Sequence, residues 1–366
     1  MVTLGDTEQG RGRPEDQRKP GRRVAGSNPL AARYSTACTR AGIAAIVTAA
    51  VSFAMAGRNP QSRACLLRTN SFLHGAERQF SHIVQAWQGG IPKQPARGRQ
   101  MSILIERLNA RERRGSKPRC HLLTHGSSDV VAARLTSLAA PFASVAPTDR
   151  WMPDGFENTA ECQLDKAPQL LSDALCVRLA KWWLPTNAQG ARTPNFDIAS
   201  TCKIGGARGL LLIEAKAHAM ELVNEIGGRQ LKEDASAQRK ASHITIGAAI
   251  DSAGIGLGAA TRLSWKISRD SHYQMSNRFA WAWKLTELGM PVVLIYLGFI
   301  RAYDMSKPGE VPFADAGAWE SATTSHSGPL FPTEVWGRRW LVNGLPLIPL
   351  IRSLDLPCSA GSDTRL

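Results

Sequence analysis

The chain has 366 residues, of which 43% are hydrophobic, so it can form two or three domains and bury a sizeable core. Its formal net charge of +15 is unevenly distributed: residues 1–119 contain 21 Lys and Arg against 7 Asp and Glu, whereas residues 120–366 contain 24 against 23. A basic surface for a polyanionic partner is therefore a property of the first third and not of the rest of the chain.

Residues 1–100 are rich in Arg, Gly, Pro, Ala and Ser and show no helical or strand periodicity, so we expect a disordered extension. A second hypothesis is that Met101 is the natural start and that these residues are not made. Residues 43–56 are apolar but fall short of the roughly 20 residues that a spanning helix needs. A signal peptide or membrane anchor there is the weaker alternative, and no stable membrane association is expected.

Residues 101–158 predict a lead-in of helices and loops, which starts with a helical stretch at Met101. Residues 159–183 predict one long helix, ended by Pro185, because their apolar residues recur at intervals near three and four. These apolar residues are Leu164, Leu170, Leu171, Leu175, Val177, Leu179 and Trp182.

The next segments predict a β-hairpin. Residues 195–200 (NFDIAS) indicate a short strand, Gly205-Gly206 indicates a turn, and residues 209–216 (GLLLIEAK) indicate a buried strand. Residues 217–240 are polar and predict a helix and a loop.

The segments after residue 240 lead to a third strand. Residues 243–250 are equally compatible with a helix and a strand, and residues 254–258 (GIGLG) predict a glycine-rich turn without the complete G-x-G-x-x-G pattern of a nucleotide site. Residues 273–288 predict an amphipathic helix, and residues 292–299 (VVLIYLGF) predict a buried strand.

This order predicts an α/β fold with a mixed central sheet flanked by helices. We expect its core in residues 159–300, preceded by the lead-in. Residues 301–366, rich in Trp, Pro and Leu, are expected to form a C-terminal covering segment.

Three side chains at the predicted hairpin carry the strongest chemical signal. Glu214 and Lys216 are two apart on a strand and therefore share a face, and the hairpin would bring Asp197 beside Glu214. Two carboxylates and a backbone carbonyl, here that of Ala215, are hard oxygen ligands suited to Mg²⁺, with Mn²⁺ as a substitute. Such a spacing also arises by chance, so the context of strands and helices is what favours a metal site.

In these two segments the chain resembles the PD-(D/E)xK nuclease superfamily, which has the restriction-endonuclease-like fold. The matching residues are Pro194-Asn195-Phe196-Asp197 and Ile213-Glu214-Ala215-Lys216, with the proline three positions before the acid instead of next to it. The resemblance covers roughly residues 159–299. It implies that Asp197 and Glu214 bind metal, that Lys216 is catalytic, and that the protein hydrolyses phosphodiester bonds, with DNA the expected substrate and RNA the second.

Two further groups are candidates for the site. In this superfamily the first core helix often carries a metal-binding acid, for which Glu161 is the candidate, with Asp165 one turn later; a solvated acid near a helix start is the alternative. Gln274 is a candidate catalytic residue at the start of the 273–288 helix. His272, Asn277 and Arg278 lie close enough to take part, and capping or surface exposure is the alternative.

Other conspicuous residues favour structural interpretations. Trp281 and Trp283 are expected in the core, and His218 is expected to be structural although histidine is the usual general base. Cys120, His121 and His125 lie close together but lack a second pair of ligands for zinc. The seven cysteines contain no C-x-x-C pair, which argues against a disulfide framework and suits a cytoplasmic protein.

The sequence therefore supports two main hypotheses. The first is an Mg²⁺-dependent endonuclease that acts on DNA. The second is a catalytically inactive module that keeps the fold and binds nucleic acid or a protein partner. A membrane-anchored protein is the third and weakest hypothesis.

Overall fold

The computed structural model describes residues 103–184, 192–303 and 309–358. All of them belong to one compact unit, Lys93–Leu366. The expectations for residues 1–100, including the apolar stretch 43–56 and the alternative start at Met101, lie outside the described residues.

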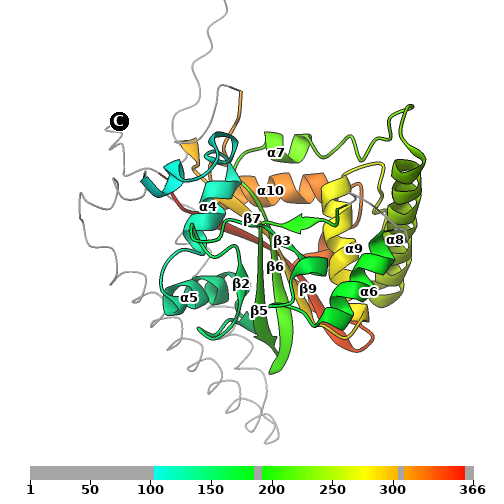
Figure 1. Cartoon of the computed structure of the whole chain (residues 1–366), viewed down its shortest axis with the longest axis horizontal. Helices are drawn as coiled ribbons and strands as arrows, with labels where there is room; N and C mark the ends of the chain where they lie inside the picture. The colour runs from blue at the N-terminus through cyan, green and yellow to red at the C-terminus, as the bar shows by residue number, and fades with distance from the viewer. Residues whose placement is uncertain (1–102, 185–191, 304–308, 359–366) are drawn as a thin grey trace, which may run out of the picture. The chain divides into compact units, whose positions relative to one another are not determined.

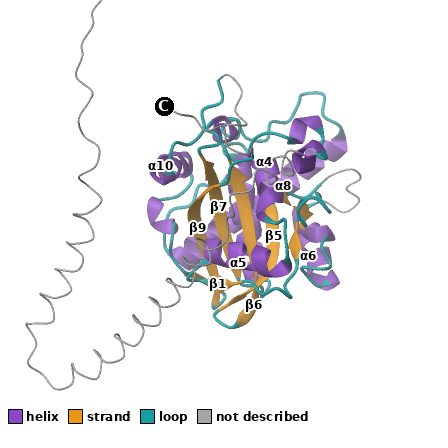
Figure 2. Cartoon of the chain, turned by 90° about the vertical axis from the view of Figure 1, so that its left-hand side faces the viewer, coloured by secondary structure: helices purple, strands orange, loops and turns teal. Residues whose placement is uncertain are grey.

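A mixed, seven-stranded sheet forms the centre of the fold (Figures 1 and 2). Its strands follow the order β1-β5-β6-β7-β9-β8, and β2 pairs with β5 beside β1. Their bounds are β1 (Ala143–Ser144), β2 (Trp151–Met152), β5 (Ile198–Ile204), β6 (Ala207–Lys216), β7 (Val292–Ile300), β8 (Trp340–Val342) and β9 (Leu345–Asp355). Two further strands, β3 (Cys162–Gln163) and β4 (Asn195–Phe196), pair separately.

The predicted hairpin and third strand are confirmed. β5 and β6 pair antiparallel around Gly205-Gly206, and both glycines have the positive φ that such a turn requires. β6 and β7 then pair in parallel, as do β7 and β9. The strands expected near residues 209–216 and 292–299 thus lie in one sheet as β6 and β7. The strand expected at 195–200 joins them only from Ile198 on, as β5, because residues 195–196 form β4 and Asp197 is a bend.

Helices cover both faces of the sheet because successive side chains of the central strands point to opposite sides. Leu210 and Leu212 face one core, and Leu211 and Ile213 face the other. Around the first core lie α6 (Asp173–Trp183), α8 (Ala237–Thr261), α9 (Tyr273–Glu287) and α10 (Ala316–Ser327); α4 (Ser116–Leu123) and α5 (Ser128–Ala139) cover the second. The expected α/β fold is therefore present, and Trp281 and Trp283 are core residues as expected.

The single helix expected over residues 159–183 is wrong in its first half. There the chain forms β3 and a 3₁₀ turn, η2 (Leu164–Lys166), and α6 begins only at Asp173. Pro168 disfavours the helical conformation of Ala167, which has φ −118° and ψ 66°. Leu164, Leu170 and Leu171 precede α6 and are buried, but they lie in a largely irregular segment. Their spacing therefore gave a false helical signal.

The glycine-rich turn expected at residues 254–258 is also wrong, because the whole segment is inside α8. α8 packs on the core through the buried side chains of Ile246, Ile250 and Leu257. Their burial outweighs the low helix propensity of the glycines. A Cβ atom on Gly256 would lie 2.4 Å from the Trp283 ring, so glycine lets α8 approach α9 closely. By length and composition α8 could cross a membrane, but one side of it belongs to this core.

The two flanking segments contribute to the sheet itself. The lead-in supplies β1 and β2, which pair with β5, in addition to α4 and α5. The C-terminal segment supplies β9, paired with β7 along its length, and α10. The expected covering segment is therefore corrected: part of it is a strand of the central sheet.

Candidate active site

β6 places the two charged residues of the E-x-K tripeptide on one face. Glu214 and Lys216 alternate with Ile213 and Ala215, which belong to the opposite core. Both charged residues are almost fully buried, with 1% and 4% of their surfaces exposed. A buried charged pair at the end of an apolar strand is unfavourable unless other polar groups surround it, so the neighbours decide its role.

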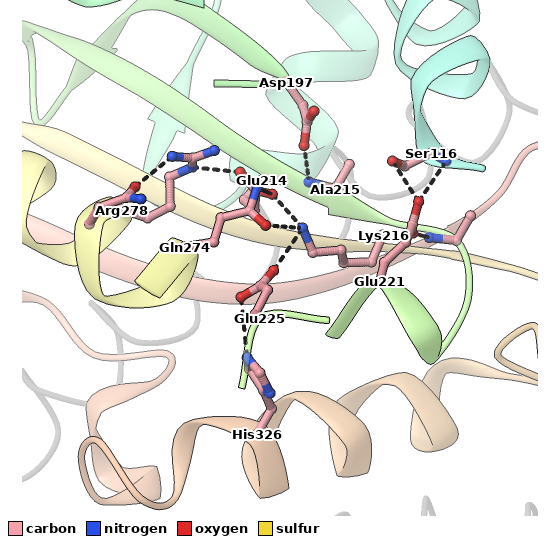
Figure 3. A network of polar contacts seen from close by, with 12 residues as sticks. Ser116, Asp197, Glu214, Ala215, Lys216, Glu221, Glu225, Gln274, Arg278 and His326 are labelled. Atoms are coloured by element: carbon pink, nitrogen blue, oxygen red, sulfur yellow. Dashed lines mark hydrogen bonds and ion pairs between the residues drawn. The ribbon is translucent and has the colours of Figure 1, made fainter. Parts of the chain in front are cut away.

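Asp197 lies beside this tripeptide, at a bend between β4 and β5 rather than inside a strand. Its Oδ2 accepts a hydrogen bond from the backbone N–H of Ala215 at 2.7 Å (Figure 3). Ile198 and Ile213 are the last backbone pair between β5 and β6. The Asp197 side chain then takes the place of the next backbone partner of β6. Since the N–H and C=O of one strand residue point to the same side, the Ala215 carbonyl lies on the same edge of β6 as this hydrogen bond.

Three cationic or amide groups surround Glu214 (Figure 3). Oε1 accepts hydrogen bonds from Lys216 Nζ and Gln274 Nε2, both at 2.5 Å. Oε2 accepts one from Arg278 Nε, also at 2.5 Å. Gln274 and Arg278 both lie on α9, so the helix that packs on this face supplies the groups that stabilise the buried carboxylate.

Lys216 is held by a second carboxylate that the sequence reasoning missed. Its Nζ lies 3.0 Å from Glu225 Oε1 in an ion pair, and Glu225 Oε2 lies 3.2 Å from His326 Nε2 on α10. Glu225 follows α7 (Met220–Val223) in a polar segment. That segment contains other acids and no periodic pattern, so nothing in the sequence distinguishes Glu225 from them.

The local charges shift the pKa values of Asp197 and Lys216. Burial and the nearby Glu214 raise the pKa of Asp197 well above its usual range, although Lys216 opposes this. Burial alone would lower the pKa of Lys216, but Glu214 and Glu225 outweigh it and raise that pKa. These shifts favour the protonated form of Lys216, whereas the positive charge of Lys216 does not offset the effects of burial and Glu214 on Asp197.

Asp197 opens into a pocket of about 520 Å³. Within the described residues, the Asp197 carboxylate accepts one hydrogen bond, which Ala215 donates to Oδ2. The other oxygen, Oδ1, is therefore free to bind a group in the pocket. The pocket is lined by Glu161, Arg192, Thr193, Pro194, Asn195, Asp197, Asn224, Glu225, Gly228, Arg229, Tyr273, Gln274, Asn277 and Arg278. Asp197, Gln274 and Arg278, which the sequence singled out, thus share one cavity.

Glu161 also lines this pocket, but not from a helix. It precedes β3, which corrects its expected place on the first core helix. Its carboxylate lies 3.0 Å from Lys117 Nζ and accepts a hydrogen bond from Asn195 at 2.9 Å, so it is not a solvated acid either. Burial alone would raise the pKa of Glu161, but these two partners lower it. Asp165 accepts a hydrogen bond from Thr193.

The other candidates lie apart or play a supporting role. Asn277 lines the pocket and accepts a hydrogen bond from Arg278 at 2.6 Å. His272 does not line it; its ring packs against that of His326, with centroids 4.6 Å apart. His218 lies outside the lining as well, 3.9 Å from Glu221. His121 and His125 both pack against Phe156.

The residue types around Asp197 suit a hard divalent cation in their chemistry, although Glu214 does not line the pocket. Asp197, Glu214 and the Ala215 carbonyl offer oxygen atoms, and the raised pKa of Asp197 marks a place where positive charge would be stabilising. Among the described residues, however, no three His, Cys, Asp or Glu side chains converge as a metal cluster. A cation would therefore depend on two carboxylates, a carbonyl and water, and it would compete with the cations that now hold Glu214.

Comparison of the chain with protein-family models, with curated proteins and with solved structures finds no match.

Proposed function

We propose that the protein is a metal-dependent nuclease that hydrolyses phosphodiester bonds, with DNA the expected substrate and RNA the second. The observation that carries the proposal is the hydrogen bond from Ala215 N–H to Asp197, because it brings the distant acid to the E-x-K tripeptide beside a pocket. This supports the resemblance to the PD-(D/E)xK superfamily and a restriction-endonuclease-like core.

In this proposal Asp197, Glu214 and the Ala215 carbonyl hold Mg²⁺ or Mn²⁺, and Glu161 adds negative charge from the side of the pocket. The bound cation would lower the pKa of a coordinated water and neutralise charge on the phosphate. Lys216 stays protonated between Glu214 and Glu225, so it contributes positive charge near the phosphate and does not act as a base. Gln274 orients Lys216 and Glu214, since it hydrogen-bonds to both.

One observation favours a second candidate, a catalytically inactive module with the same fold. Both oxygens of Glu214 are already engaged by Lys216, Gln274 and Arg278. A buried ion network that satisfies itself is compatible with a purely structural role and with binding of a nucleic acid or protein partner.

Incubation of the purified protein with plasmid DNA, linear DNA and RNA separates the two candidates. Each substrate is tested with Mg²⁺, with Mn²⁺ and with EDTA. The nuclease predicts cleavage of at least one substrate with either cation and none with EDTA. Absence of cleavage under all conditions, with retained binding of the same substrates, would favour the inactive module.

A further inference from the structure

Arg229 is a positive group in the pocket wall that does not belong to the network around Glu214. It lies in the pocket lining together with Asp197 and Tyr273. Its Nη1 donates a hydrogen bond to the Tyr273 hydroxyl at 2.9 Å, and its guanidinium carbon lies 5.5 Å from the centre of that ring. Within the described part of the chain, Arg229 makes no ion pair with a carboxylate.

The backbone of Arg229 is also held by a hydrogen bond. Its N–H donates to the Arg269 carbonyl at 2.8 Å, next to the segment that leads into α9. The preceding residue, Gly228, has φ +68°, and a Cβ atom there would lie 2.1 Å from the Asp270 carbonyl oxygen. Only glycine fits so close to that backbone, so the chain holds Arg229 at one place in the pocket wall.

A guanidinium that is held in place but not neutralised is suited to an anion. Arginine is always protonated and binds phosphate oxygens with its planar fork of donors. Its neighbour Tyr273 orients the guanidinium through a neutral hydroxyl and leaves its charge intact. Arg278, by contrast, is already paired with Glu214 and has no such free charge.

We propose that Arg229 binds a phosphate of the substrate next to the one that lies at Asp197. This inference depends on the proposed function and names its substrate more closely: a polynucleotide with at least two consecutive phosphodiesters. A substrate with a single phosphodiester would leave Arg229 without its anion and bind more weakly.

The test measures binding by the full-length protein in EDTA, so that cleavage does not interfere. Fluorescence anisotropy follows a labelled single-stranded thymidine octamer as the salt concentration is varied. Arg229→Gln should weaken binding roughly 10-fold and lower the slope of the salt dependence by about one, because one phosphate contact is lost. Arg229→Lys should keep part of the affinity. Tyr273→Phe, which frees the guanidinium, should give an intermediate loss.

The matched control is Arg239→Gln, which removes the same charge at an exposed position near the start of α8 and outside the pocket. It should bind as the wild type does. Unlabelled thymidine trinucleotide, with two phosphodiesters, should compete better than the dinucleotide for the wild type but not for Arg229→Gln. Equal losses in Arg229→Gln and Arg239→Gln, or a wild-type affinity in Arg229→Gln, would overturn the inference.

The same variants separate this inference from the proposed function. Cleavage with Mg²⁺ but no effect of Arg229→Gln on binding would refute the phosphate site and leave the nuclease intact. Loss of binding in Arg229→Gln, with no cleavage by the wild type under any condition, would support the phosphate site and refute the proposed hydrolysis.

Discussion

The ammonium group of Lys216 lies 3.0 Å from Glu225, and both side chains are almost completely buried. Glu225 in turn contacts His326, so α10 fixes the carboxylate that holds the lysine. The lysine is therefore positioned by two carboxylates, Glu214 on its own strand and Glu225 on the segment after α7.

The first prediction follows from this contact. Glu225→Gln keeps the size of the side chain but removes one of the two negative charges that hold the Lys216 ammonium, so Glu214 alone would position it. We expect kcat for nucleic-acid cleavage to fall by up to about 100-fold, the effect of misplacing a catalytic group by about 1 Å, and KM to stay nearly constant. Glu225→Asp should recover part of kcat.

The control for this variant is Glu233→Gln, at an exposed position in the loop before α8. Its kcat and KM should equal those of the wild type. An unchanged kcat in Glu225→Gln would show that Glu225 has no role in placing Lys216.

The second prediction concerns the raised pKa of Asp197. The folded protein binds this proton more tightly than the unfolded chain does, so the free energy of unfolding falls as the pH rises through the folded-state pKa. Asparagine has no such proton. In EDTA at pH 8, Asp197→Asn should therefore melt a few degrees above the wild type, and this difference should shrink toward pH 4.

Mg²⁺ should reverse the order, because a cation stabilises the ionised carboxylate and raises the melting temperature of the wild type alone. Asp234→Asn, at an exposed loop position, is the control and should show neither effect. Identical melting curves for Asp197→Asn and the wild type from pH 4 to pH 8 would contradict the prediction.

The third prediction concerns Glu214, the centre of the network. Glu214→Gln leaves the buried Arg278 without its carboxylate, and breaking a buried ion pair from one side is destabilising by about 3–5 kcal/mol. We expect the free energy of unfolding in urea without metal to fall by at least about 3 kcal/mol. Glu320→Gln, an exposed position on α10, should change it little. Equal stability of Glu214→Gln and the wild type would show that the ion network is not needed for folding.

The hairpin could be predicted because its signals are local. Gly205-Gly206 provides the positive φ of the turn, and the uninterrupted apolar run up to Ile213 identifies a strand buried on both faces. The alternation along that strand then places Glu214 and Lys216 on one face. The helix over residues 273–288 was predictable for the same reason, since its pattern lies within one element.

The errors arose where distant segments decide the local structure. The segment around Gly256 is helical because α8 packs against the core, where Gly256 lies close to Trp283, and such contacts cannot be predicted from the neighbouring residues. β9 joins the sheet by pairing with β7, although the sequence LPLIPLIRSL contains two prolines that disfavour a central strand. Glu225 was missed because its partners, Lys216 and His326, come from separate parts of the chain.

The fourth prediction separates metal binding from catalysis. Asp197→Asn removes a negative charge from the metal site, whereas Lys216→Ala removes a positive one. In a calorimetric Mn²⁺ titration, Asp197→Asn should bind at least about 10-fold more weakly than the wild type, and Lys216→Ala should bind at least as tightly as the wild type. Circular dichroism checks that both variants are folded. Equal Mn²⁺ affinities for Asp197→Asn and the wild type would exclude Asp197 as a ligand.

The most direct test of the nuclease proposal is the rate of plasmid cleavage with Mg²⁺ by the wild type and by folded Lys216→Ala. Lys216 lies beside Glu214 and supplies the positive charge that would stabilise the transition state. Its loss should therefore lower the rate about 100-fold or more, as expected for removal of a group that acts on developing charge. The proposal predicts cleavage by the wild type, none with EDTA, and this loss in the variant. Cleavage by Lys216→Ala at the wild-type rate would contradict it.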